Sequence, residues 1–71
     1  MYEIEDAIGR VIRARKLTVA EVARKTNVRY SRLYNATHIG GAYRMELRAD
    51  ELLRVCFFLR VDPLQLLKEG Q

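Results

Sequence analysis

The sequence is poor in the residues that build chemical sites: its 71 residues include one cysteine, one histidine, one proline and no tryptophan. A lone Cys56 cannot form a disulfide within the chain, and Cys56 with His38 cannot supply the four ligands of a structural zinc site. No nucleophile or acid–base constellation is present. We therefore expect a protein that is not an enzyme and that uses no metal, no cofactor and no small-molecule ligand.

Long apolar runs are also absent. No stretch approaches the ~20 apolar residues of a membrane span, and the acidic segment 1–6 has no apolar run of the kind found in a signal peptide. A single unpaired cysteine is typical of a reducing compartment. We expect a cytoplasmic protein without a membrane partner, folded as one domain over residues 1–71 that leaves no effector domain.

Negative charge is scarce in the middle of the chain. The net charge is +4, but residues 10–48 carry ten basic residues against only Glu21 and Glu46, a local excess of +8. Such a block favours a polyanion as partner. The alternative interpretation is an ordinary solvated surface.

Strand signals are weak and helical spacing is strong. The apolar pattern predicts helices over about residues 2–15 and 46–59, and Asp62 and Pro63 predict a last helix that starts there and ends near Gly70. Cys56 falls on an apolar stripe, which favours a buried structural role over a nucleophile. The stripes are Ile4, Ile8, Val11 and Ile12; then Leu52, Val55, Cys56 and Leu59; then Leu64, Leu66 and Leu67.

Residues 18–37 predict two short helices joined by a tight turn. Thr18 and Glu21 have the spacing of a capping box, which would start a helix over about 18–26. Asn27 tolerates the left-handed backbone that a sharp turn needs. A second helix is expected over about 29–37.

The helix expected over 29–37 has one apolar side and one polar, aromatic side. At about 100° per residue, Leu33 and Ala36 point inward. The opposite side holds Ser31, Tyr34 and Asn35, flanked by Tyr30 and Arg32. Side chains of this kind on a small rigid scaffold suit the edge of a DNA groove.

Each of these side chains has more than one possible role. Arg32 can donate two hydrogen bonds to guanine, clamp a phosphate or form a surface ion pair. Asn35 can pair with adenine or simply end the helix, and Ser31 is small enough to let the backbone approach any base. Tyr30 and Tyr34 can pack on sugar or a thymine methyl group, and Tyr30 could instead be half-buried against the preceding helix.

The chain resembles the Cro/phage-repressor helix-turn-helix family, the XRE-type DNA-binding domains. The likeness covers about Ile8 to Leu67 and is carried by segment 18–28 with Leu33 inward, and by segment 52–67. The resemblance implies an all-α, compact five-helix domain of the lambda-repressor type. It also implies double-stranded operator DNA as partner, a homodimer on DNA, and a nucleoid-associated location in a bacterial host.

The resemblance makes residues 29–37 the recognition helix. It implies base contacts by Tyr30, Ser31, Arg32 and Asn35, and DNA-backbone contacts by Thr18, Val19, His38 and Arg44. Val19 stands where the family often has Gln, so only its N–H group can meet a phosphate. From their own chemistry, Arg29 and Tyr34 join the residues expected to contact the DNA backbone.

The helix expected over 46–59 is more apolar than one core stripe requires. Leu53, Phe57 and Phe58 widen the stripe, and they could pack under the first or last helix or form a dimer or partner surface. Dimers of the resembled family tend to use the region of the last helix, which makes Arg60 and Val61 the other interface candidates.

Together these features predict a sequence-specific regulator of transcription. We expect a small phage-type repressor, Cro-like or immunity-type, that acts by occupying its operator. One alternative is a protein-binding module that grips a host protein through Leu53, Phe57 and Phe58 or through the tyrosines. The other is an antitoxin-like DNA binder that also neutralises a toxin.

Overall fold

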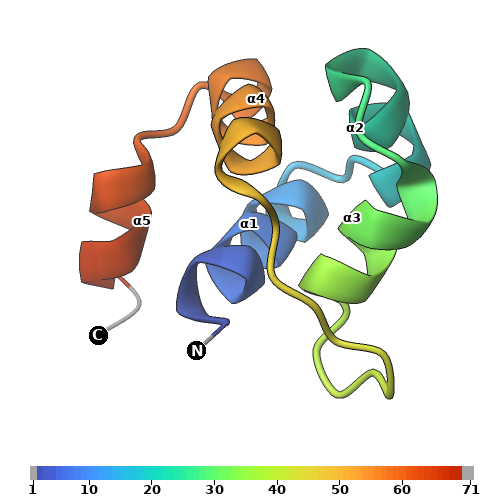
Figure 1. The fold of residues 1–71 in the computed structure, drawn as a ribbon. Coiled ribbons are helices and arrows are strands. Elements are labelled where there is room, and N and C mark those ends of the chain that lie inside the picture. The colour runs from blue at the N-terminus through green and yellow to red at the C-terminus, as the bar shows by residue number, and fades with distance from the viewer. Residues whose placement is uncertain (1, 70–71) are drawn as a thin grey trace.

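A computed structural model describes residues 2–69 of the protein. In this part of the chain the regular elements are α1 (Glu3–Ala14), α2 (Val19–Thr26), α3 (Tyr30–Thr37), α4 (Ala49–Leu59) and α5 (Pro63–Glu69), with no strand. Figure 1 shows α1 at the centre, with α2 and α3 on one side of it and α5 on the other. The prediction of an all-α, five-helix domain is confirmed.

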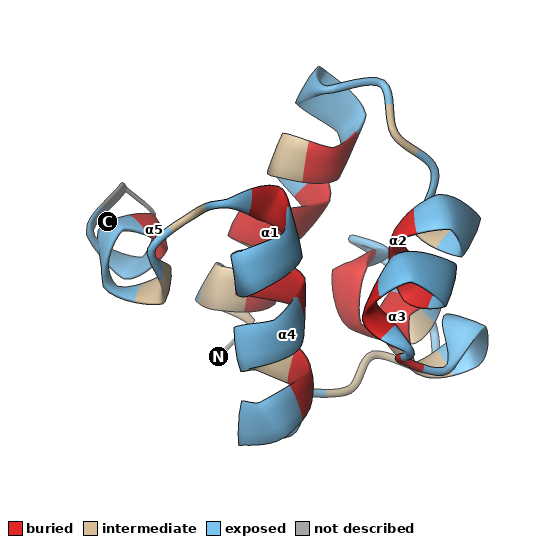
Figure 2. Ribbon diagram, turned by 90° about the horizontal axis from the view of Figure 1, so that it is seen from above, coloured by how far each residue is buried: buried red, intermediate tan, exposed pale blue. Residues whose placement is uncertain are grey.

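The core forms where the apolar stripes of the helices meet. Ile8 and Ile12 of α1, Leu33 of α3, and Val55 and Leu59 of α4 are almost completely buried in one cluster. Burying a side chain of this size stabilises a fold by about 1.5–3 kcal/mol. Figure 2 shows the buried parts of the helices facing one another, so the outer faces of α2, α3 and α4 are left for other tasks.

A close approach between α1 and α3 fixes the position of α3. A Cβ atom added to Gly9 would lie 2.9 Å from the backbone oxygen of Thr37, a contact that real Cβ atoms do not tolerate. Glycine at this position therefore lets the two helix backbones pack directly against each other. The C-terminal end of α3 is held against α1 as a result.

Helix α4 starts later than predicted. The sequence pattern favoured a start near residue 46, but the helix begins at Ala49. Leu47 is buried, and its N–H group donates to Glu5 Oε2 of α1 at 3.1 Å, which holds this segment in an extended form. The Arg48 N–H group donates to Glu51 Oε1 at 2.9 Å, so the first helical turn starts one residue after Arg48.

The other helix ends agree with the sequence pattern. The first helix is two residues shorter than the predicted range 2–15. Asp62 Oδ1 accepts the Leu64 N–H group at 3.0 Å, as expected of a cap before Pro63. The predicted end near Gly70 lies outside the described residues. No helix within residues 2–69 combines the length and the apolar character that crossing a membrane requires.

Candidate nucleic-acid interface

Helices α2 and α3 are joined by a rigid turn built from local chemistry. Glu21 N–H donates to Thr18 Oγ1 at 3.0 Å, and Thr18 N–H donates to Glu21 Oε1 at 3.1 Å. This capping box, worth about 1 kcal/mol, starts α2 as predicted. Asn27 ends the helix in the left-handed conformation with φ 60° and ψ 31°, also as predicted. The buried Val28 then anchors the turn to the core.

The two sides of α3 differ as the sequence predicts. Leu33 and Ala36 are buried. Tyr30, Ser31 and Tyr34 are exposed, while Asn35 is half-buried. Tyr30 is 51% exposed, and its ring stacks on that of Tyr34 while it also borders a hollow lined by Ala20 and Ala23 of α2. Both roles considered for Tyr30 stay predictions. A polar, aromatic face of α3 is thus open to a ligand (Figure 2).

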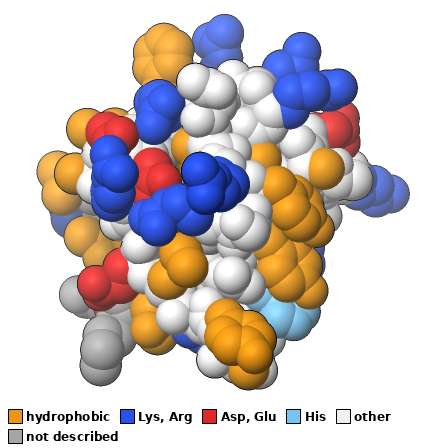
Figure 3. Space-filling model, turned by 45° about the vertical axis from the view of Figure 1, so that its right-hand side comes forward, with side chains coloured by type: hydrophobic (Ala, Val, Ile, Leu, Met, Phe, Trp, Pro, Cys, Tyr) orange, Lys and Arg blue, Asp and Glu red, His pale blue; other side chains and the backbone are white. Residues whose placement is uncertain are grey.

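Three rings stack along the exposed face of α3. The ring centroids of Tyr30 and Tyr34 are 5.8 Å apart with an interplanar angle of 27°, and those of Tyr34 and His38 are 4.8 Å apart at 15°. Figure 3 shows the resulting aromatic patch on the surface, with the histidine at its end. Stacked pairs are worth about 0.5–1.5 kcal/mol each. The stack holds the rings in a fixed row.

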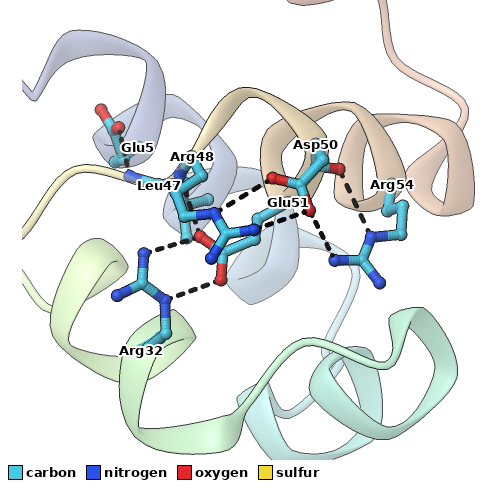
Figure 4. Close-up of polar contacts among 7 residues, drawn as sticks. All are labelled: Glu5, Arg32, Leu47, Arg48, Asp50, Glu51 and Arg54. Atoms are coloured by element: carbon cyan, nitrogen blue, oxygen red, sulfur yellow. Dashed lines mark hydrogen bonds and ion pairs between the residues drawn. The ribbon is translucent and has the colours of Figure 1, made fainter.

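Arg32 turns away from the open face of α3 and toward α4. Its Nε donates to Glu51 Oε2 at 2.6 Å and its Nη2 donates to Glu51 Oε1 at 2.8 Å, a bidentate ion pair drawn in Figure 4. The outward orientation expected for a base-contacting arginine is therefore corrected. A contact between Arg32 and guanine requires this pair to open, and the contact itself stays a prediction.

Glu51 is the functional residue that the sequence interpretation missed. It is 5% exposed and joins α3 to the first turn of α4. The hydrogen bond from Arg32 lowers the pKa of Glu51 to about 2 despite burial, with help from the Arg48 N–H group. The same hydrogen bond raises the pKa of Arg32. A local signal in the sequence could have found it. Glu51 stands three residues after Arg48, the residue before the helix, and a carboxylate at this spacing can accept the N–H group of that residue.

Further cations surround this ion pair. Arg48 Nε lies 3.3 Å from Asp50 Oδ1, and Arg54 Nη2 lies 3.1 Å from Asp50 Oδ2, both in exposed positions (Figure 4). Exposed pairs of this kind contribute little to stability, so their cations can exchange partners. Figure 3 shows the basic cluster beside the aromatic patch. Arg48 is thus an additional candidate for a phosphate contact.

Arg44 lies inward, in contrast to the expected contact with the DNA backbone. Its Nη2 donates to Asp6 Oδ1 at 2.6 Å and to the Ala36 carbonyl oxygen at 2.9 Å. Its guanidinium also covers the Tyr2 ring at 4.4 Å. These contacts tie the loop after α3 to α1. The expected outward orientation is therefore corrected, and a phosphate contact by Arg44 stays a prediction.

The other predicted backbone contacts lie at helix ends. Thr18 is exposed and Val19 half-buried at the start of α2, where the helix dipole favours an anion and the capping box engages the N–H groups of Thr18 and Glu21. Arg29 and His38 are exposed at opposite ends of α3. All four positions are accessible to a phosphate, and their contacts stay predictions.

The interface candidates come from α4 and the segment that follows it. Leu53 is 58% exposed and Phe57 86%, so these two are not packed under α1 or α5, whereas Phe58 is largely covered, with 37% of its surface exposed. Arg60 is exposed in a left-handed conformation, and Val61 packs against the core. The dimer or partner surface stays a prediction for this set.

The described residues do not form a metal centre. Within residues 2–69, no group of three or more His, Cys, Asp and Glu side chains could hold a metal ion. Cys56 is buried, and burial raises the pKa of its thiol. The side-chain chemistry of the open surface is that of hydrogen bonding, aromatic contact and positive charge.

Comparison with known proteins gives one match. The family model described as the Cro/C1-type HTH DNA-binding domain matches residues 7–68. This range contains α2, α3 and α4 completely, together with most of α1 and α5. The searches of curated proteins and of solved structures gave no match.

Proposed function

The chain belongs to the Cro/C1-type helix-turn-helix DNA-binding family, and from this premise we propose that it is a sequence-specific repressor of the small phage type. The family is non-enzymatic and makes the protein a DNA-binding regulator. In the proposal, the protein acts at the nucleoid of a bacterial host. Occupancy of an operator then blocks RNA polymerase sterically.

The exposed face of α3 is the observation that carries this proposal. The capped α2, the Asn27 turn and the close packing on Gly9 hold α3 in place, so its outward side chains are presented in a fixed geometry. Rigid presentation is what base reading in the major groove requires. The net charge of +8 over residues 10–48 adds the attraction for phosphate.

The proposed contacts divide into base-reading and backbone-positioning groups. Ser31 and Asn35 read base edges, and Tyr30 contacts a thymine methyl group or a base edge. Tyr34, stacked between its neighbours, directs its hydroxyl to the sugar–phosphate backbone. Arg32 joins the base-reading group only if DNA displaces Glu51. The remaining contacts with the DNA backbone are assigned to Thr18, Val19, Arg29 and His38. Arg48 is added because the structure places it beside the Arg32–Glu51 pair. Arg44 contacts the backbone only if its internal contacts open.

Asn35→Ala is expected to weaken binding to the preferred site selectively. The preferred site is first selected from a random duplex library, and affinities are then measured by fluorescence anisotropy on that site and on a scrambled duplex. Loss of a base contact costs about 1–3 kcal/mol, roughly 5- to 150-fold, on the selected site and little on the scrambled one. Arg29→Ala is the control, since loss of a phosphate contact weakens both. Equal losses for Asn35→Ala would remove it from the base-reading group.

A dimer would place two α3 helices in successive major grooves about 34 Å apart. Leu64 and Leu67, three residues apart on α5, are both exposed, Leu64 by 68%. They form an apolar stripe that a second copy could cover. We therefore assign the dimer contact to α5.

Leu64→Lys is expected to convert the dimer into a monomer. A charge at the centre of a small apolar contact cannot be paired there and opposes association. Light scattering after size exclusion at micromolar protein measures the mass. The control is Tyr43→Lys, which also puts a lysine at an exposed large residue. A wild-type monomer, or a Leu64→Lys dimer, would contradict this assignment.

A further inference from the structure

A second surface, separate from the exposed face of α3, is hollowed into a groove. It has a volume of about 1060 Å³ and lies between the C-terminal end of α2 and the C-terminal half of α4, extending to the start of α5. Its apolar part comes from Leu53, Phe57 and Phe58. None of the residues proposed to contact bases lines it, so the groove is available while α3 is on DNA.

The apolar part of the groove is unusual for a small monomer. Leu53 is 58% exposed, Phe57 86%, and Phe58 is also exposed. Single exposed apolar residues are ordinary, but three that share one hollow mark an interaction site. Because most of the surface of Leu53 and Phe57 and 37% of that of Phe58 is exposed, the benefit of removing this surface from water is left for a partner.

The rim of the groove carries positive charge only. Lys25, Arg54 and Arg60 line it, and no carboxylate does. Within residues 2–69, neither Lys25 nor Arg60 has an acidic partner, and Arg54 has only the exposed Asp50. The surface therefore combines an apolar floor with cations at its edge.

This combination discriminates between possible occupants. A two-fold pairing of two copies would bring each rim against its own image. Of the six cations, only the two Arg54 side chains have a carboxylate partner, so like charges oppose such contact. Double-stranded DNA would gain little from the phenylalanines, because its bases are stacked inside the duplex and its phosphates face the protein. A small molecule would find few polar groups to orient it, since Thr26 Oγ1 already donates to the Val22 carbonyl at 2.7 Å.

We propose that the groove binds an acidic amphipathic helix of a partner protein. Apolar side chains at i, i+3, i+4 and i+7 would fill the floor at Leu53, Phe57 and Phe58, the usual mode of a helix in a groove. Carboxylates beside them would meet Lys25 and Arg60. The proposal does not depend on DNA binding, although it gives a DNA-bound regulator a site for a second protein.

Two synthetic helices test the proposal on the full chain. Both are hydrocarbon-stapled and carry Leu and Phe at the four anchor positions; one has Glu at the flanking positions and the other has Lys. Anisotropy with a fluorescent label is expected to give at least about tenfold tighter binding of the Glu peptide in low salt. Amide shifts in two-dimensional NMR should centre on α4 residues 53–58 and on Lys25 and Arg60.

Two variants distinguish the contribution of the apolar floor from that of the basic rim. Phe57→Ser, at a position too exposed to affect folding, is expected to abolish binding of both peptides while DNA affinity stays unchanged. Lys25→Glu combined with Arg60→Glu should reverse the preference in favour of the Lys peptide. The proposal is overturned by equal affinities for the two peptides, by an unchanged preference in the double variant, or by a dimer that Phe57→Ser dissociates. DNA affinity is measured on the same preparations, so failure of the groove and failure of DNA binding are distinguished.

Discussion

Glu51→Gln is expected to lower the free energy of unfolding by about 2–3 kcal/mol at neutral pH. The carboxylate is buried, accepts two hydrogen bonds from Arg32 and caps α4 through the Arg48 N–H group. Glutamine keeps the shape but removes the charge that Arg32 pairs with. A domain of this size has roughly 4–10 kcal/mol of stability, so the loss is a large fraction. Urea denaturation followed by circular dichroism measures it.

Glu51 also makes the free energy of unfolding depend on pH. The pKa of Glu51 in the folded protein is about 2, below the ~4.3 of an unfolded chain. A lowered pKa stabilises the fold above the unfolded value, and this stabilisation is lost as pH falls from about 5 toward 2. The Glu51→Gln variant should show a shallower decline over this window. The matched control is Asp50→Asn, which removes the exposed ion pairs with Arg48 and Arg54. It is expected to change the free energy of unfolding by at most about 1 kcal/mol. If both variants behaved alike, Glu51 would have no special role.

Arg32→Ala extends this test to function. If Arg32 holds α3 against α4, the variant is less stable and loses affinity for preferred and scrambled DNA alike, measured below its unfolding temperature. If DNA displaces Glu51 and Arg32 then contacts guanine, the loss falls on the preferred site. The two patterns decide whether Arg32 is a positioning residue or a base-reading one.

Local chemistry explains why part of the site could be predicted from sequence. Thr18 and Glu21 stand three residues apart, and Asn27 acts on its own backbone, so the ends of α2 follow from neighbours in the chain. The helical period likewise places Leu33 inside. The open face of α3 could therefore be predicted before its structure was known.

The long-range pairs could not be predicted in this way. Arg32 and Glu51 are 19 residues apart, and Arg44 and Asp6 are 38 apart, so no helical period relates them. An arginine at the edge of a polar face has the same sequence signature whether it faces DNA or a carboxylate. The packing of α4 against α2 and α3 decides which of the two the arginine faces, and this packing depends on the whole core. Phe57 illustrates the same limit, because an apolar residue that widens a core stripe can either pack under a neighbouring helix or lie exposed, and the sequence does not decide between them.

The affinity for DNA is expected to fall about 1000-fold between 50 and 200 mM salt. Arg29 and Arg48 are already assigned to the DNA backbone, and Arg24 of α2 joins them here because it borders the same hollow as Arg29 and Tyr30; Arg48 lies beside Arg32 (Figure 4). If each of these three cations meets one phosphate in each protomer of a dimer, about six counterions are released and the slope of log K against log salt is about −5. Anisotropy titrations at four salt concentrations measure the slope.

Variants in the flanking cations test where this slope comes from. Arg29→Gln and Arg48→Gln should each make the slope shallower by about 2 in the dimer, one contact per protomer, on preferred and scrambled DNA alike. Arg60→Gln is the matched control, because it removes the same charge from the groove and should leave the slope nearly unchanged. A flat dependence in the wild type would mean that phosphate does not supply the affinity. An equal effect of all three variants would mean that net charge, rather than the cations around α3, attracts the DNA.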